Sequence, residues 1–230
     1  MEVLTGVVEF FLTWENWTGD AGIVARTGEH IGLSVLSLAV AGSLAIPAAV
    51  WLGHVGRGGV VAVSAVNIGR AVPSFAIVAL ALPITIRMGL GLGFWPTFIA
   101  LVALALPPMF TNAYTGVREV DAGLREAALG MGMTGREVLF GVEIPLASPV
   151  IMAAIRVTAV QVVATATLGA LVAWGGLGRY IIDGFSQRDF VELVVGAILV
   201  AVLSILTDAG FGVLERVVAP RGLPRPTSVS

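Results

Sequence analysis

The sequence predicts an all-α membrane protein with about five transmembrane helices, and three observations lead to this fold class. Hydrophobic residues make up 57% of the 230 residues, against about 45–50% in an ordinary soluble domain. Charged residues make up only 12%, about half of the usual ~25%. Five stretches are long and apolar enough to cross the ~30 Å hydrocarbon core of a bilayer as helices. This composition argues against a soluble globular enzyme and against a disordered chain.

The five expected spans follow one another along most of the chain. They are Ile31–Leu52, Gly59–Ile86, Phe94–Tyr114, Pro149–Trp174 and Phe190–Leu214. The second stretch is the longest, and Pro73 interrupts it because proline has no backbone N–H to donate to the preceding turn. Two arrangements fit this pattern, a single kinked span or two separate segments. Pro73 is accordingly either a hinge that lines a pathway or a static kink.

The distribution of arginine residues predicts the orientation of the spans. Five spans place the two ends of the chain on opposite sides, and the more basic side faces the cytoplasm. An external N-terminus and an internal C-terminus put seven arginines inside (Arg57, Arg118, Arg125, Arg136, Arg216, Arg221 and Arg225) and four outside (Arg26, Arg87, Arg179 and Arg188). We therefore expect an external segment of residues 1–29, a transmembrane domain of residues 30–216 and a cytoplasmic tail of residues 217–230.

The external N-terminal segment does not have the pattern of a secretory signal, because it lacks a basic region followed by an apolar stretch. Within it, Val7–Trp17 carries aromatic side chains at intervals of three and four residues. That spacing is typical of a short helix lying in the membrane interface. A loosely ordered tail fits the same residues.

Two residue types are absent from the chain, and each absence excludes some chemistry. The chain has no cysteine, which excludes disulfides, thiolate catalysis and cysteine-ligated metals. All 13 basic residues are arginine, so there is no phosphate-binding loop G-x-x-x-x-G-K-[ST] and no lysine for Schiff-base chemistry. We therefore expect no cofactor or metal in this chain, and any ATP and Mg²⁺ on a partner subunit. GC-rich coding also explains the arginine bias. The net charge of −2 argues against a nucleic-acid partner.

One predicted inner loop, residues 116–148, is much longer than the other loops. Asp121 is a plausible N-cap for a short helix through Leu129. Gly130 and Gly132 are placed to end that helix.

The second half of this loop carries its own helix signals. Thr134-Gly-Arg-Glu137 has the S/T-x-x-E spacing of a capping box, which opens a second short helix. Pro145 and Pro149 are expected to close the segment before the fourth span. The loop is therefore predicted to form a helix–turn–helix on the cytoplasmic face, with small residues at its corner that allow close approach of another backbone.

The same loop contains a spaced motif. Glu126-Ala127-Ala128 is followed after three residues by Gly132, and after nine more by Val142-Glu143-Ile144-Pro145. This spacing resembles the EAA motif, EAA-x3-G-x9-I-x-L-P, of the membrane subunits of binding-protein-dependent ABC importers. Val142 stands for Ile and Ile144 for Leu, both apolar for apolar. The resemblance implies that these residues form a coupling helix that docks on the ATPase subunit: Glu126, Ala127, Ala128, Gly132 and Pro145. The alternative is an ordinary surface loop with capping glycines.

Further segments resemble the permeases of osmoprotectant importers. They are Thr27–His30, Ala71–Ser74, Thr111–Val117, Gly130–Thr134, Glu143–Met152 and Gly175–Gly178. The resemblance implies a methionine-importer-like ABC permease fold in the bacterial cytoplasmic membrane, in contact with membrane lipid. It implies three protein partners: an ABC ATPase subunit, an extracytoplasmic substrate-binding protein, and a second permease copy or a paralogue. The implied substrate is an osmoprotectant such as glycine betaine, carnitine, choline or proline betaine.

Polar residues inside the spans are candidates for a translocation path. The candidates are Asn67, Pro73, Ser74, Thr158, Gln161 and Thr165. Three of them lie at i, i+3 and i+7 and so share one face of the fourth span. Such residues usually face the interior of a bundle or a water-filled cavity. Hydrogen bonds between helices explain them equally well.

Two other features complete the set of candidates. Gly175, Gly176 and Gly178 predict a tight outer turn, which the resemblance places at an external gate where a binding protein docks. Asp208, near the inner end of the fifth span, is expected to pair with Arg70 or Arg156, although Arg156 is also close enough to the membrane surface to snorkel.

Three other functions remain open on sequence grounds: an ABC permease for methionine or another amino acid, an ion-coupled secondary transporter, and a structural membrane subunit without a pathway. Intramembrane acids and repeated halves are typical of secondary transporters, and this chain shows neither clearly. It also shows no aromatic cage for a quaternary ammonium group, which fits selection of the substrate by a separate binding protein.

Overall fold

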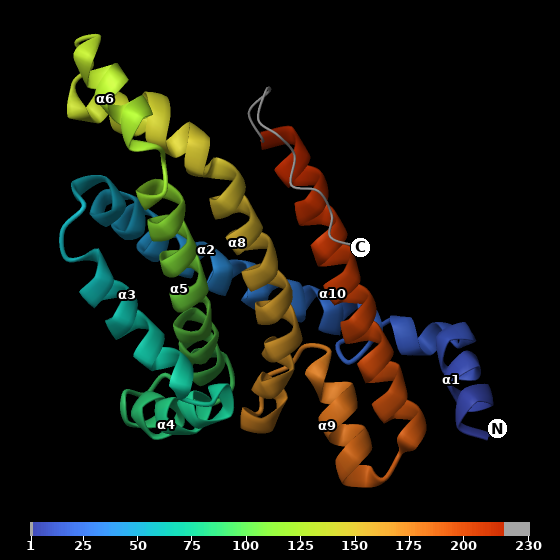
Figure 1. Cartoon of the computed structure of the whole chain (residues 1–230). Coiled ribbons are helices and arrows are strands. Elements are labelled where there is room, and N and C mark those ends of the chain that lie inside the picture. The colour runs from blue at the N-terminus through green and yellow to red at the C-terminus, as the bar shows by residue number, and fades with distance from the viewer. Residues whose placement is uncertain (1, 219–230) are drawn as a thin grey trace.

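The computed structural model describes residues 2–218, and this part of the chain is built of helices (Figure 1). Helices α5 (Phe94–Arg118), α8 (Ile144–Thr165) and α10 (Phe190–Val218) lie in that order, and α2 (Ile23–Val55) crosses behind α5 and α8. Helix α6 (Ala122–Gly130) and the C-terminal end of α10 lie at one end of the molecule, and α9 (Gly178–Gln187) lies at the other. The expected cytoplasmic tail lies outside the described residues from residue 219 onward.

Within the described residues, four segments are long and apolar enough to span a membrane. They are Ile23–Val55, Phe94–Arg118, Gly135–Val172 and Phe190–Val217. The first begins well before the predicted Ile31, because nothing interrupts the helix after Gly22, which caps it in an extended conformation. Thr27–His30, expected to precede the first span, therefore forms part of its first turns.

The second predicted span is two helices, α3 (Gly59–Ile68) and α4 (Ser74–Arg87), joined by the 3₁₀ turn η2 (Gly69–Ala71). Pro73 caps α4 with an extended backbone, and Val72 before it is extended as well. This follows from the steric restriction that proline places on the preceding residue. At ~1.5 Å per residue neither helix alone reaches across ~30 Å of hydrocarbon. Of the two arrangements that fit the sequence, the structure has the separate segments.

The fourth predicted span begins inside the expected inner loop, and here the prediction of a separate second helix was wrong. Helix α7 (Gly135–Val138) continues through a π-helical turn, η3 (Leu139–Glu143), directly into α8, and the 3₁₀ segment η4 (Ala166–Val172) follows α8. Pro145 directly follows the π-helical turn, where the Ile144 N–H donates to the Leu139 carbonyl, and this shift of the hydrogen-bond ladder accommodates the missing N–H of Pro145. Pro149 lies inside α8 and has no N–H to donate to the carbonyl of Pro145. The Ser148 hydroxyl donates to that carbonyl in its place (2.8 Å). The two prolines therefore do not close the segment.

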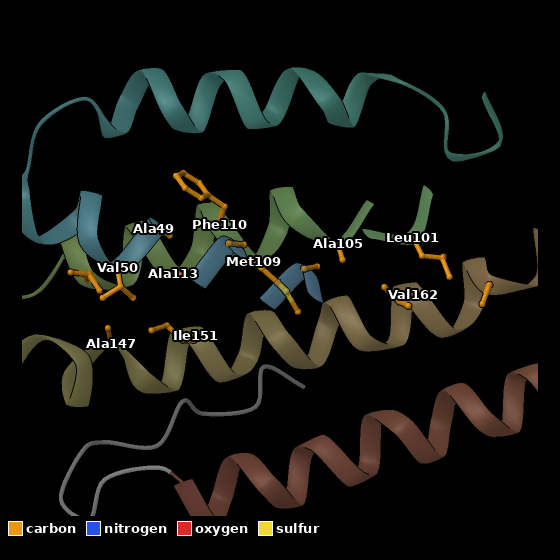
Figure 2. Close-up of a cluster of buried hydrophobic side chains, with 14 of the residues drawn as sticks. Ala49, Val50, Leu101, Ala105, Met109, Phe110, Ala113, Ala147, Ile151 and Val162 are labelled. Atoms are coloured by element: carbon orange, nitrogen blue, oxygen red, sulfur yellow. The ribbon is translucent and has the colours of Figure 1, made fainter. Parts of the chain in front are cut away.

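The main core lies between α2, α5 and α8 (Figure 2). Small buried side chains from all three helices line it, including Ala49, Ala105, Ala113 and Ala147. Met109 fills the space between them. Small residues allow helix backbones to approach closely, and the gain in van der Waals contact stabilises helix association inside a bilayer.

The N-terminal segment is ordered rather than a loose tail. Helix α1 (Glu2–Leu12) packs on α10 with Val7 buried, and a 3₁₀ turn, η1 (Trp14–Trp17), follows it. Phe10 meets the ring of Tyr180 edge-on at 6.1 Å. The Tyr180 hydroxyl donates to the Ala21 carbonyl (2.8 Å), and burial raises the pKa of this phenol, so it stays protonated as a donor. Residues 2–22 are thereby attached to α9 and α10.

Candidate functional site

The expected coupling segment projects at one end of the molecule, with α6 beyond the end of α5 (Figure 1). Both predicted caps are present. The Leu124 N–H donates to the Asp121 carboxylate (3.0 Å), and Thr134 and Glu137 form a reciprocal capping box. Gly132 has φ +93°, which glycine adopts without a steric penalty, and the space around it is open. The corner is therefore defined by its own residues and is accessible to a partner.

The residues of the EAA motif do not all face the same way. Glu126 and Ala127 are exposed, whereas Ala128 is buried, with 2% of its surface accessible. Leu129 and Met131 add apolar surface next to them, at 53% and 78% exposure. The exposed group (Glu126, Ala127, Leu129, Met131 and Gly132) is called the coupling surface below. Pro145, the last residue of the expected docking set, is half-buried at the beginning of α8.

A buried polar cluster that no sequence motif predicted lies behind the coupling surface. Glu143 is only 1% exposed. Its carboxylate oxygen Oε2 accepts a hydrogen bond from His54 Nδ1 (2.7 Å), and Oε1 lies 3.0 Å from Arg125 Nε. The Arg125 guanidinium also donates to the carbonyl of Val117 at the end of α5. His54, Arg125 and Glu143 are called the inner cluster below. One signal could have found it, namely a carboxylate between Val142 and Ile144, directly before an apolar span.

At the opposite end, the first turns of α2 hold the predicted outer turn. The Gly176 N–H donates to the Glu29 carboxylate (2.7 Å), and the Leu177 N–H donates to His30 Nδ1 (3.3 Å). His30 Nε2 lies 2.8 Å from the carbonyl oxygen of Val163 in α8. A neutral imidazole with its proton on Nε2 satisfies both contacts at once. Glu29, His30 and the turn 175–178 are called the outer cluster below.

Two glycines of this turn are required, Gly178 by space and Gly176 by backbone conformation. A Cβ on Gly178 would lie 2.4 Å from the carbonyl oxygen of Thr167, a backbone atom, whereas one on Gly175 would lie 2.0 Å from a carboxylate oxygen at the end of the flexible Glu29 side chain. Gly176 has φ +74°. The prediction of a tight glycine turn is therefore confirmed, and its contacts to α2 are added by the structure.

The candidate path residues are dispersed rather than gathered around one cavity. Thr158 is fully buried and donates to Ala154 in its own helix (2.7 Å), while Gln161 and Thr165 are half-buried. The Thr111 hydroxyl donates to Asn67 at 3.5 Å, which joins α5 to α3. Ser74 is half-buried in the first turn of α4, and Pro73 is exposed.

A separate apolar groove of about 540 Å³ opens between α2, α8 and α10. Ile155, Ala159 and Val163 line its α8 side, and within the described residues its lining includes none of the candidate path residues. Near this groove, Arg156 makes a bidentate pair with Asp208 (2.7 Å for both contacts) and a further contact to Glu215 (3.3 Å). Arg156, rather than Arg70, is thus the partner of Asp208.

Comparison with known proteins places this architecture in a family. Residues 41–220 match the model of the binding-protein-dependent transport system inner membrane component, and the chain belongs to this family. It is a multi-pass permease component of a bacterial ABC importer, works with an ATPase and a binding protein, and is not itself catalytic. Family membership argues against two of the functions that the sequence left open, an ion-coupled secondary transporter and a structural membrane subunit without a pathway.

The relatives cover nearly the whole chain. The glycine betaine/carnitine/choline transport system permease protein OpuCB of Bacillus subtilis is 36% identical over 93% of this chain and 96% of its own length. The choline transport system permease protein OpuBB of the same organism is 35% identical over the same shares. The osmoprotectant import permease protein OsmW of Salmonella typhimurium is 31% identical over 89% of this chain and 95% of its own length.

The solved structures support the predicted fold. A chain of the inward-facing MetNI methionine ABC transporter matches with a TM-score of 0.75, covering 86% of this chain and 96% of that chain. At 22% identity, this likeness shows the fold alone. The expected methionine-importer-like permease fold is confirmed.

Proposed function

We propose that this permease moves an osmoprotectant such as glycine betaine, carnitine, choline or proline betaine across the membrane. The observation that carries the proposal is the similarity over nearly the whole chain to permeases named for such substrates. Methionine or another amino acid is the alternative substrate, and the likeness to the methionine transporter supports only the fold.

The test is uptake into proteoliposomes that hold the permease, its ATPase and its binding protein. We expect ATP-dependent, vanadate-sensitive uptake of radiolabelled glycine betaine, carnitine or choline, with no uptake of methionine. Uptake of methionine in preference to all of these would contradict the osmoprotectant assignment and identify methionine as the substrate.

We further propose that the coupling surface docks on the ATPase. Its support is its composition, since small and apolar exposed residues allow close approach and Glu126 offers a carboxylate to a basic group of the partner. Ala127→Asp places a charge on this surface without altering a strained backbone. Gly132→Asp alters the docking surface and the left-handed turn together.

The measurement for this second proposal is co-purification of the ATPase with the permease from membranes. Ala127→Asp should reduce the amount of bound ATPase and abolish uptake while the permease remains in the membrane. The control is Ala122→Asp, at the start of the same helix and also exposed. Normal ATPase binding and uptake in Ala127→Asp would contradict the assignment.

Two other assignments complete the proposal. The outer turn 175–178 lies at the external gate where the binding protein docks, and a second permease copy or paralogue completes the pathway.

The translocation pathway is lined by the half-buried Gln161 and Thr165 and by the broken second span around Pro73. Gln161→Leu should change the apparent KM or rate of uptake without loss of assembly, and unchanged uptake kinetics would remove Gln161 from the path.

A further inference from the structure

The inner cluster lies where three parts of the chain meet: the last turn of α2, the coupling helix α6 and the beginning of α8. We propose that Glu143 is a positioning residue that fastens the coupling segment to α2 and α8 together. A displacement of α6 by the ATPase then moves both helices at once. This inference rests on the proposed role of the coupling surface.

The two carboxylate oxygens of Glu143 face different elements of the fold. Oε2 accepts from His54 of α2, and Oε1 faces Arg125 of α6. A carboxylate removed from water is tolerated only when it is paired and hydrogen-bonded, so this arrangement depends on all three elements keeping their relative positions. An apolar side chain at position 143 would fill the same space but would not fix the orientation of His54 or Arg125.

Helix α6 packs mainly on α7 and on the π-helical turn η3, which continue into α8. Arg125 supplies its polar links, to Glu143 and to the carbonyl of Val117 at the end of α5. One guanidinium therefore joins α6 both to the end of α5 and to the carboxylate that binds His54 of α2.

The backbone that carries Glu143 also joins the coupling segment to α8. Glu143 is the last residue of η3, and the helix passes without a break from Gly135 into α8. Pro145 cannot donate to the carbonyl of Gly141, which removes one α-helical hydrogen bond here and favours the wider π turn. Such turns are frequent at functional sites. A shift of the coupling segment is thus transmitted along α8 by the chain itself. It reaches α2 through the His54 contact and through the apolar packing of Val50 against Leu139 and Ile151.

The experiment uses the complete importer in proteoliposomes and measures the number of ATP molecules hydrolysed per substrate imported. Glu143→Gln keeps the shape and a hydrogen bond to His54 but removes the charge that pairs with Arg125. We expect this ratio to rise about tenfold, within the ~5–150-fold range of coupling between sites, while the ATPase remains bound to the permease. A wild-type ratio in Glu143→Gln would overturn the inference.

The matched control is Asp208→Asn, which removes a carboxylate from the Arg156 pair between α8 and α10. This pair does not contact α6, so the ratio should stay at its wild-type value. An equal rise in both variants would show a general loss of packing and would contradict a specific role for Glu143.

A second variant keeps the test decisive if Glu143→Gln fails to accumulate. The double variant Arg125→Met/Glu143→Leu leaves no buried charge unpaired, and such replacements of ion pairs are often neutral or stabilising. We expect it to accumulate and to bind the ATPase, yet to hydrolyse more ATP per substrate imported than the wild type. A wild-type ratio would show that the inner cluster contributes only to stability. If Ala127→Asp also leaves ATPase binding intact, the coupling surface itself is misassigned. If only the Glu143 variants behave as wild type, this inference alone fails.

Discussion

The two ends of α2 are each joined to α8 by a histidine, but by different kinds of contact. At the inner end, His54 and Arg125 bind one buried carboxylate, so the contact is made between side chains. At the outer end, Glu29 and His30 accept from backbone N–H groups of the turn 175–178. The inner contact is an ion pair between side chains that needs both partners in place, whereas the outer contact holds a turn by its backbone N–H groups. The inner end thus ties α2 to the segment that leads into α8, and the outer end ties α2 to the turn that follows α8.

The largest effect should come from breaking the outer turn itself. In Gly178→Ala, the added Cβ would lie 2.4 Å from the Thr167 carbonyl, a backbone atom that cannot turn away. We expect the free energy of unfolding to fall by about 1–3 kcal/mol, the usual cost of overpacking, measured by thermal unfolding in detergent. The control is Gly210→Ala in α10, where no atom lies within 4 Å of the new Cβ. Equal stability of the two variants would show that the turn is not tightly packed.

The next effect separates the two ends of α2. Leu177→Cys introduces a single thiol into a chain without cysteine, at a position only 1% exposed. Adding His30→Leu removes the partners of the Leu177 N–H and the Val163 carbonyl. Unmade buried hydrogen bonds cost ~1–3 kcal/mol each, so modification of the thiol by a maleimide should accelerate by at least about tenfold.

The matching variant at the inner end is His54→Leu in the same Leu177→Cys chain. The modification rate should not change, because the contacts of His54 lie at the other end of the helix. Faster modification in this variant would show that the two ends are coupled through α2 and α8 even without the ATPase.

The smallest effect concerns the cap of the helix that leads into α8. Thr134→Ala removes both hydrogen bonds between the Thr134 hydroxyl and Glu137. Loss of an N-cap costs about 1 kcal/mol, visible as a small drop in the thermal midpoint. Thr134→Ser keeps the hydroxyl and should behave as wild type, and a full loss of uptake in Thr134→Ala would assign the cap a role beyond local stability.

Local signals in the sequence predicted much of the fold and part of the site. Asp121 and the Thr134–Glu137 box were placed correctly because a cap depends on residues three positions apart. Pro73 marked the break in the second span for a similar reason, since proline acts on its own neighbours. The prediction from Pro145 and Pro149 was wrong, because the π-helical turn accommodates the missing N–H of the first and the Ser148 hydroxyl compensates for that of the second.

The sequence by itself determined the membrane class, the capped short helix that begins at Asp121 and the exclusion of a lysine-based phosphate loop, because composition and short spacings carry this information. Only the tertiary structure decided that Arg156 is the partner of Asp208, and that His54 and Glu143 meet across 89 positions of sequence. It also brought His30 to Leu177 across 147 positions. Such contacts depend on how the helices pack, and the packing is set by the summed fit of small side chains, which no single motif in the chain encodes.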